Sequence, residues 1–107
     1  MSEEQRKIGE RIRELRKRKK LSQDDLGALL GCGKVYIHYI ETGKRKLKRE
    51  MAEKLGSFFN LHPTLLLDPD LSVERIYLIS QVLSQLDHLP DHRVETIISL
   101  LEDLANK

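Results

Sequence analysis

Residues 21–45 have the sequence LSQDDLGALLGCGKVYIHYIETGKR. Ser22 precedes Asp25 by three residues, which is the spacing of a capping box at the start of a helix. Apolar residues follow at helical spacing until Gly31, and a glycine after the last periodic residue commonly ends a helix, because it enters the left-handed region without a Cβ clash. A second, short helix is expected from about Lys34 to Glu41. The stretch therefore predicts two short helices joined by a tight turn that contains glycine.

The residue pattern within these two helices separates an inner face from an outer one. Gly27 is small where the two helices must touch closely. The residues spaced to face inward are Leu26, Leu30, Cys32, Ile37 and Ile40. The opposite face of the second helix carries Lys34, Val35, His38 and Tyr39. This is the layout of a helix-turn-helix, and it leaves the outer face of the second helix available to DNA.

Further helices are expected on both sides of this pair. The same periodic spacing of apolar residues predicts helices over about 3–20, 51–59 and 62–67. Proline and acidic residues at 68–70 predict a boundary, beyond which helices over about 72–86 and 90–106 are expected to form a hairpin. No alternating stretch or two-residue hairpin turn signals β structure. The sequence thus predicts an all-α protein, with a five-helix domain at 1–70 and a helical hairpin at 71–107.

Charge is divided unevenly between the two halves of the 107-residue chain. Residues 1–50 hold 15 Lys and Arg against 8 Asp and Glu, a balance of +7, whereas residues 51–107 hold 4 against 9, a balance of −5; together they give the net charge of +2. Such asymmetry favours a polyanion such as nucleic acid as the partner of the basic half. The run from Arg16 to Lys20 is either part of that surface or a solvated helix end that complements the helix dipole.

Several classes of protein are not indicated. The single cysteine, Cys32, has no matching Cys and His cluster, so neither a metal nor another cofactor is expected. No stretch approaches the roughly 18 consecutive apolar residues that span a membrane, and we expect a cytoplasmic protein. No nucleophile–base pair, pair of carboxylates or phosphate-binding loop is visible, so an enzyme is not expected.

From about Ile8 to Leu67 the sequence resembles the lambda and 434 repressor and Cro family, also called the xenobiotic-response-element-type (XRE-type) helix-turn-helix family. The likeness is carried by Leu21-Ser22-Gln23 through Gly31 and by the string at 40–45, IETGKR. The resemblance implies that the second helix of the motif enters the major groove, and that Gln23, Lys44 and Arg45 contact phosphates. It also implies a structural ion pair between Arg16 and Glu41. The chain departs from the family at Gly33, where Ser or Thr is usual, although glycine is a tolerable cap.

The chemistry of the outer face suggests a division of roles in DNA binding. Lys34 can donate to guanine O6 or N7, and Val35 can contact a thymine methyl group. His38 and Tyr39 can bond a base edge or a phosphate. Phosphate contacts carry no direct sequence information, so the residues expected to set affinity and register are Gln23, Lys44, Arg45 and Lys46.

The C-terminal hairpin carries more apolar surface than two helices can cover by themselves. The simplest partner is the same hairpin of a second subunit, which would form a four-helix interface. The residues expected at this interface are Ile76, Ile79, Leu83, Leu86, Val94, Ile97, Leu101 and Leu104. The alternative is that the hairpin folds back on the N-terminal helices.

These observations predict a sequence-specific transcriptional regulator that binds double-stranded DNA as a homodimer, as a repressor on a palindromic operator. One alternative is an antitoxin or an anti-repressor-controlled switch, whose hairpin binds a second, antagonistic protein. Another is a protein-interaction module that has kept the fold without DNA binding.

Overall fold

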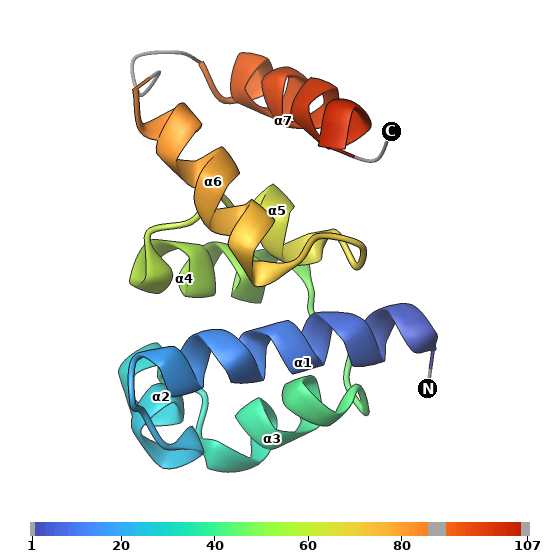
Figure 1. The fold of residues 1–107 in the computed structure, drawn as a ribbon. Coiled ribbons are helices and arrows are strands. Elements are labelled where there is room, and N and C mark those ends of the chain that lie inside the picture. The colour runs from blue at the N-terminus through green and yellow to red at the C-terminus, as the bar shows by residue number, and fades with distance from the viewer. Residues whose placement is uncertain (1, 86–89, 106–107) are drawn as a thin grey trace.

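The computed structural model describes residues 2–85 and 90–105, and within these ranges every regular element is a helix (Figure 1). The elements are α1 Glu3–Arg18, α2 Gln23–Leu30, α3 Lys34–Thr42, α4 Arg49–Phe59, α5 Pro63–Leu67, α6 Val73–Ser84 and α7 Asp91–Ala105. The predicted all-α fold is confirmed. Among the described residues, no helix has the length and apolar character needed to cross a membrane.

Serine side chains define three of the helix starts. The Oγ atoms of Ser2, Ser22 and Ser72 each accept a bond from the backbone N–H three residues later, at 3.0, 2.9 and 3.2 Å. At α2 the Asp25 carboxylate also accepts from the Ser22 N–H at 3.0 Å, which completes the capping box that the sequence predicted. These bonds satisfy N–H groups that the first turn of a helix leaves unpaired.

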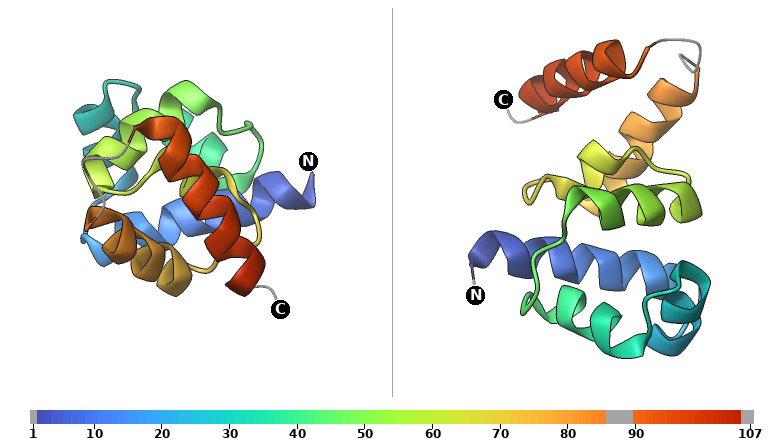
Figure 2. Two further views of the ribbon diagram at one scale, coloured as in Figure 1. Left: turned by 90° about the horizontal axis from the view of Figure 1, so that it is seen from above. Right: turned by 180° about the vertical axis from the view of Figure 1, so that it is seen from behind.

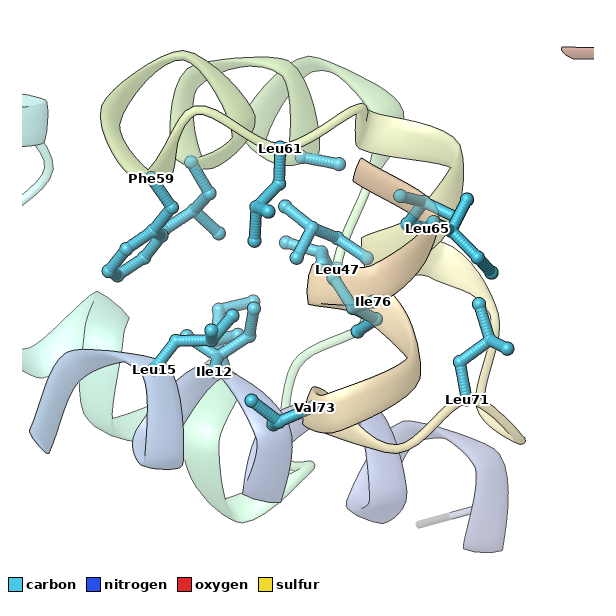
Figure 3. Close-up of a cluster of buried hydrophobic side chains, with 14 of the residues drawn as sticks. Ile12, Leu15, Leu47, Phe59, Leu61, Leu65, Leu71, Val73 and Ile76 are labelled. Atoms are coloured by element: carbon cyan, nitrogen blue, oxygen red, sulfur yellow. The ribbon is translucent and has the colours of Figure 1, made fainter. Parts of the chain in front are cut away.

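The long helix α1 separates two layers, with α2 and α3 on one side and α4, α5 and α6 on the other (Figure 1). Its Ile12 and Leu15 side chains are fully buried. Figure 3 shows them facing Phe59, Leu61 and Val73, which come from the opposite layer. One contiguous core therefore joins the helix-turn-helix to the helices that follow it.

Two glycines allow the helices of the first layer to approach closely. A Cβ atom on Gly9 of α1 would lie 2.3 Å from the carbonyl oxygen of Ile40 in α3. A Cβ atom on Gly27 of α2 would lie 2.4 Å from the carbonyl carbon of Gly33. Because these neighbours are backbone atoms, a side chain at either position would push α3 away from its supports.

A buried ion pair ties α3 to α1. The Arg16 guanidinium donates from Nε to Glu41 Oε2 at 2.6 Å and from Nη2 to Glu41 Oε1 at 2.9 Å. Its Nη1 donates to the Leu21 carbonyl at 2.8 Å, so the same side chain also fixes the turn into α2. The hydrogen bonds to Glu41 raise the pKa of Arg16, which favours its charged form.

A second buried arginine holds the segment between α5 and α6. Arg11 of α1 donates to the carbonyl oxygens of Leu66 at 2.8 Å and Leu71 at 2.7 Å, and also to that of Asp68. Burial lowers the pKa of this guanidinium, because the charged form loses solvation. The linker is therefore bound to the first helix mainly through its backbone carbonyls, and the Asp70 carboxylate adds an ion pair with Lys7 at 3.7 Å.

The helices after residue 70 pack onto the rest of the chain rather than standing apart from it. Leu71, Val73 and Ile76 belong to the same buried core as α1 and α4, and Arg18 of α1 pairs with Glu74 of α6 at 2.8 Å. The buried core thus continues past Asp70, where the sequence predicts a domain boundary. Figure 2 shows α7 lying over the top of the preceding helices, where it packs against α5 and α6.

The residues expected at the dimer interface differ in exposure. Those buried within the single chain are Ile76, Ile79 and Leu83. Those partly buried against the same core are Val94, Ile97 and Leu101. Leu104 is exposed, and Leu86 lies outside the described residues. The apolar stripes led us to expect these residues at an interface between subunits. The fold instead uses most of them in the core of the single chain.

We expect Arg16→Ala to lower the free energy of unfolding by about 3–5 kcal/mol, because Glu41 would remain buried without its cation. Arg13 lies on the same helix and is exposed, so Arg13→Ala is the matched control and should change stability by less than about 0.5 kcal/mol. Urea unfolding followed by circular dichroism measures both variants. A loss below about 1 kcal/mol for Arg16→Ala would contradict a stabilising role for this pair.

Candidate nucleic-acid interface

The outer face of α3 is open to solvent on the side of the molecule opposite α7 (Figure 1). Ile37 and Ile40 are buried on the inner face of this helix. The residues expected to read bases are all exposed: Lys34, Val35, His38 and Tyr39. The structure therefore brings the four predicted side chains together on one accessible helical face.

Gly33 begins α3 in a backbone conformation that other residues rarely adopt. Its φ of 83° and ψ of 162° lie in a region populated almost only by glycine, and no side chain caps the helix. The usual Ser or Thr would gain a capping bond here but would be strained. Glycine in place of the usual Ser or Thr thus suits the backbone conformation at position 33.

The loop after α3 is anchored by its own backbone and by α1. Gly43 ends the helix with a φ of 79°, in the left-handed region. The side-chain amide of Gln5 donates to the Gly43 carbonyl at 3.2 Å, and the Arg45 N–H donates to the Tyr39 carbonyl at 3.1 Å. These bonds place the basic residues that follow Gly43 beside the C-terminal end of α3.

Two of these basic residues lie over aromatic rings of α3. Lys44 Nζ is 5.8 Å from the centroid of the Tyr39 ring, and the guanidinium carbon of Arg45 is 5.4 Å from that of Tyr36. Both distances fall within the range of cation–π attraction. Lys46 is exposed in the same loop. The result is a cluster of cations next to the outer face of α3.

Gln23, expected at a phosphate, makes contacts within the protein. Its side-chain nitrogen donates to Glu41 Oε1 at 3.1 Å and lies 3.4 Å from His38 Nδ1. Gln23 is partly buried at the start of α2. The structure thus places it beside one of the expected base-reading residues, between that residue and the buried ion pair.

The basic run at the end of α1 is divided among different environments. Besides the buried Arg16, Arg18 pairs with Glu14 and Glu74. Lys19 Nζ lies 6.0 Å from the centroid of the Phe58 ring. Lys17 and Lys20 are exposed. Arg18 and Lys19 therefore support the packing of α1 against α6 and α4, while Arg16 pairs with α3.

Sequence reasoning missed Gln5 and Gly9, which position the interface, and Arg11, which holds the linker between α5 and α6. Gln5 and Gly9 share the face of α1 that carries Ile12 and Arg16, so helical spacing together with the small size of glycine could have indicated the close contact with α3. Arg11 gave no such signal, because its partners are backbone carbonyls more than 50 residues away in sequence.

Within the described ranges, no three His, Cys, Asp or Glu side chains gather in a way that could hold a metal ion. Cys32 is partly buried, and burial raises the pKa of its thiol, which disfavours the reactive thiolate.

Comparison with known proteins agrees with this geometry. Residues 7–68 match the family described as "Helix-turn-helix domain". Among solved structures, the chain is similar to the restriction-modification controller protein C.AhdI from Aeromonas hydrophila. The identity is 36%, the TM-score is 0.53, and the match covers 57% of this chain and 92% of that one. Curated protein sequences gave no match.

The family match begins within α1 and ends just after α5, so it includes the whole helix-turn-helix and its supporting core, while α6 and α7 lie outside it. The resemblance noted from the motif at 21–45 is confirmed. This chain belongs to the helix-turn-helix domain family, in the XRE-type group that the lambda and 434 repressors and Cro represent.

Proposed function

We propose that this chain is a cytoplasmic transcriptional regulator that binds a palindromic operator in double-stranded DNA as a homodimer, and that it represses transcription by occluding the polymerase. The observation that carries the proposal is the exposed outer face of α3 with a cluster of cations at its end. An α-helix fits the major groove, where each base pair presents a distinct pattern of donors and acceptors. No catalytic step is part of this function.

The positions of the individual side chains support the roles that we propose for them. Lys34 and Val35 lie on the first turn of α3, and His38 and Tyr39 on the next, so we assign all four to base edges. Lys44, Arg45 and Lys46 are assigned to phosphates beside the groove, where they set register and affinity. Gln23 would have to give up a contact within the protein before its N–H groups could reach a phosphate.

Apolar side chains on α6 and α7 support a dimer. The exposed ones are Leu78 at 62%, Val82 at 45%, Leu100 at 59% and Leu104 at 65%. They repeat four residues apart on each helix, so each helix carries an apolar stripe that the single chain does not cover. We propose that a second copy covers these stripes. A helix-turn-helix dimer of this kind reads two half-sites about 34 Å apart.

A narrower second candidate is control of a restriction–modification system. It is favoured by the 36% identity to the controller protein C.AhdI over 57% of this chain. Recovery of the operator sequence would discriminate this role, since a controller's site should lie upstream of restriction and modification genes.

We expect the purified chain to bind duplex DNA with a strong dependence on salt. With about six phosphate contacts in a dimer, affinity should fall about a thousandfold between roughly 50 and 200 mM salt. Fluorescence anisotropy on a site recovered from a random DNA pool measures this dependence. A flat salt response, or no enriched site, would leave only the interaction-module alternative.

Lys34→Ala and Lys44→Ala should have different effects. Loss of a base contact at Lys34 should relax preference at one position of each half-site, at a cost of about 1–3 kcal/mol. Loss of a phosphate contact at Lys44 should weaken binding to all sequences about equally. Binding-site selection with each variant measures the two effects, and a reversal would place α3 differently in the groove.

Placing charge on the α7 stripe should separate the dimer. We expect the double variant Leu100→Asp with Leu104→Asp to be monomeric and folded, because both side chains are exposed in the single chain. Its operator affinity should fall at least about a hundredfold, since the second half-site loses its high effective concentration. Ser99→Asp, on an exposed polar position of the same helix, is the control. Sedimentation equilibrium measures the mass; a monomeric wild type would favour the switch with a separate protein partner.

A further inference from the structure

A chain of hydrogen bonds leads from the buried ion pair to the outer face of α3. Both oxygens of the Glu41 carboxylate accept from Arg16, at 2.6 and 2.9 Å. The Glu41 side chain is only 2% exposed, and its two oxygens face N–H groups of the Arg16 guanidinium, so both act as acceptors. A carboxylate paired in this way offers no hydrogen to a further group. Any further group that bonds Glu41 must therefore be a donor.

This requirement fixes the orientation of the Gln23 amide. The amide carries an NH2 group on one side and a carbonyl oxygen on the other, and only the NH2 group can face Glu41 Oε1, at 3.1 Å. The same nitrogen lies 3.4 Å from His38 Nδ1. Its second hydrogen is thus available to the imidazole, and turning the amide over would set its oxygen against the carboxylate.

We infer that Arg16, Glu41 and Gln23 hold His38 as the neutral tautomer with its proton on Nε2, so that His38 reads DNA as a hydrogen-bond donor. Nδ1 accepts from Gln23, which leaves the Nε2–H group as the polar atom free to face the groove. Gln23 is a positioning residue for specificity in this arrangement. The inference rests on the proposed function and deepens it, because it assigns the chemistry of one base contact.

The tautomer determines with which bases His38 can form a hydrogen bond. In the major groove guanine presents the acceptors N7 and O6, whereas cytosine presents only the N4 amino donor. An Nε2–H donor can therefore bond guanine, adenine N7 or thymine O4, and it excludes cytosine on the strand it contacts. With the proton on Nδ1 instead, Nε2 would be an acceptor, which could bond the amino group of cytosine or adenine and would exclude guanine and thymine. Without Gln23, His38 Nε2 could be either a donor or an acceptor. The fixed amide of Gln23 makes it a donor.

The tautomer can be measured in the free protein, without DNA. In 15N-labelled wild type at about pH 8.5, where an imidazole is neutral, a long-range 1H–15N correlation spectrum distinguishes protonated from unprotonated ring nitrogens. Loss of the signal in His38→Gln assigns it. We expect a protonated Nε2 and an unprotonated Nδ1, and in Gln23→Met a shift toward a mixture of tautomers. A protonated Nδ1, or an equal mixture in wild type, would overturn the inference even if the protein binds DNA.

Binding-site selection tests the consequence for specificity. Wild type should prefer an acceptor base over cytosine by about tenfold at one position of each half-site, and Gln23→Met and His38→Phe should both lose that preference. Thermal melting checks that the variants fold. If Gln23 contacts only phosphate, Gln23→Met will instead weaken all sequences equally with the preference retained, and the inference is wrong. Failure of wild type to bind any DNA would refute the proposed function and leave the tautomer measurement to decide this inference.

Discussion

The buried pair of Arg16 and Glu41 is the interaction on which the position of α3 and its outer face depends. It joins the first helix to α3 through two hydrogen bonds, and a third bond from Arg16 fixes the Leu21 carbonyl at the entry to α2. Because each charge is out of water, removing one would strand the other at a cost of several kcal/mol. The pair also extends outward, since Glu41 Oε1 accepts from Gln23 as well. The ion pair is therefore bonded to Gln23, which lies beside His38, one of the residues expected to contact DNA.

The glycines of the first layer allow this pair to form. With no Cβ at Gly9 or Gly27, α1 lies against the backbone of Ile40 and α2 lies against the backbone of Gly33. A helix of nine residues such as α3 would be marginal in water by itself, so its position comes from these contacts rather than from helix propensity. A rigid support of this kind would lower the ordering cost of the base contacts proposed for the outer face.

The two C-terminal helices present one side to the core of the chain and another, apolar side to solvent. One side of α6 completes the core of the N-terminal helices through Ile76 and Ile79, and Arg11 binds the linker that leads to it. The outer stripes on α6 and α7 remain apolar, and these helices lie outside the residues that match the family. The proposed dimer would thus share α6 with the core of the single chain, so variants that probe assembly should alter the outer stripes and spare Ile76 and Ile79.

The sequence by itself determined the helices, the Ser22 cap and the four exposed residues of α3, because periodicity, capping and glycine stops act over a few neighbouring residues. The tertiary structure alone decided which apolar residues of α6 enter the core and which remain outside, and it alone brought Arg11 to its carbonyls. It also turned Gln23 toward Glu41 and His38, although the resemblance implied a phosphate contact. These outcomes depend on partners 15 to 60 residues away. No local pattern specifies such partners, since they meet only when the layers pack around α1.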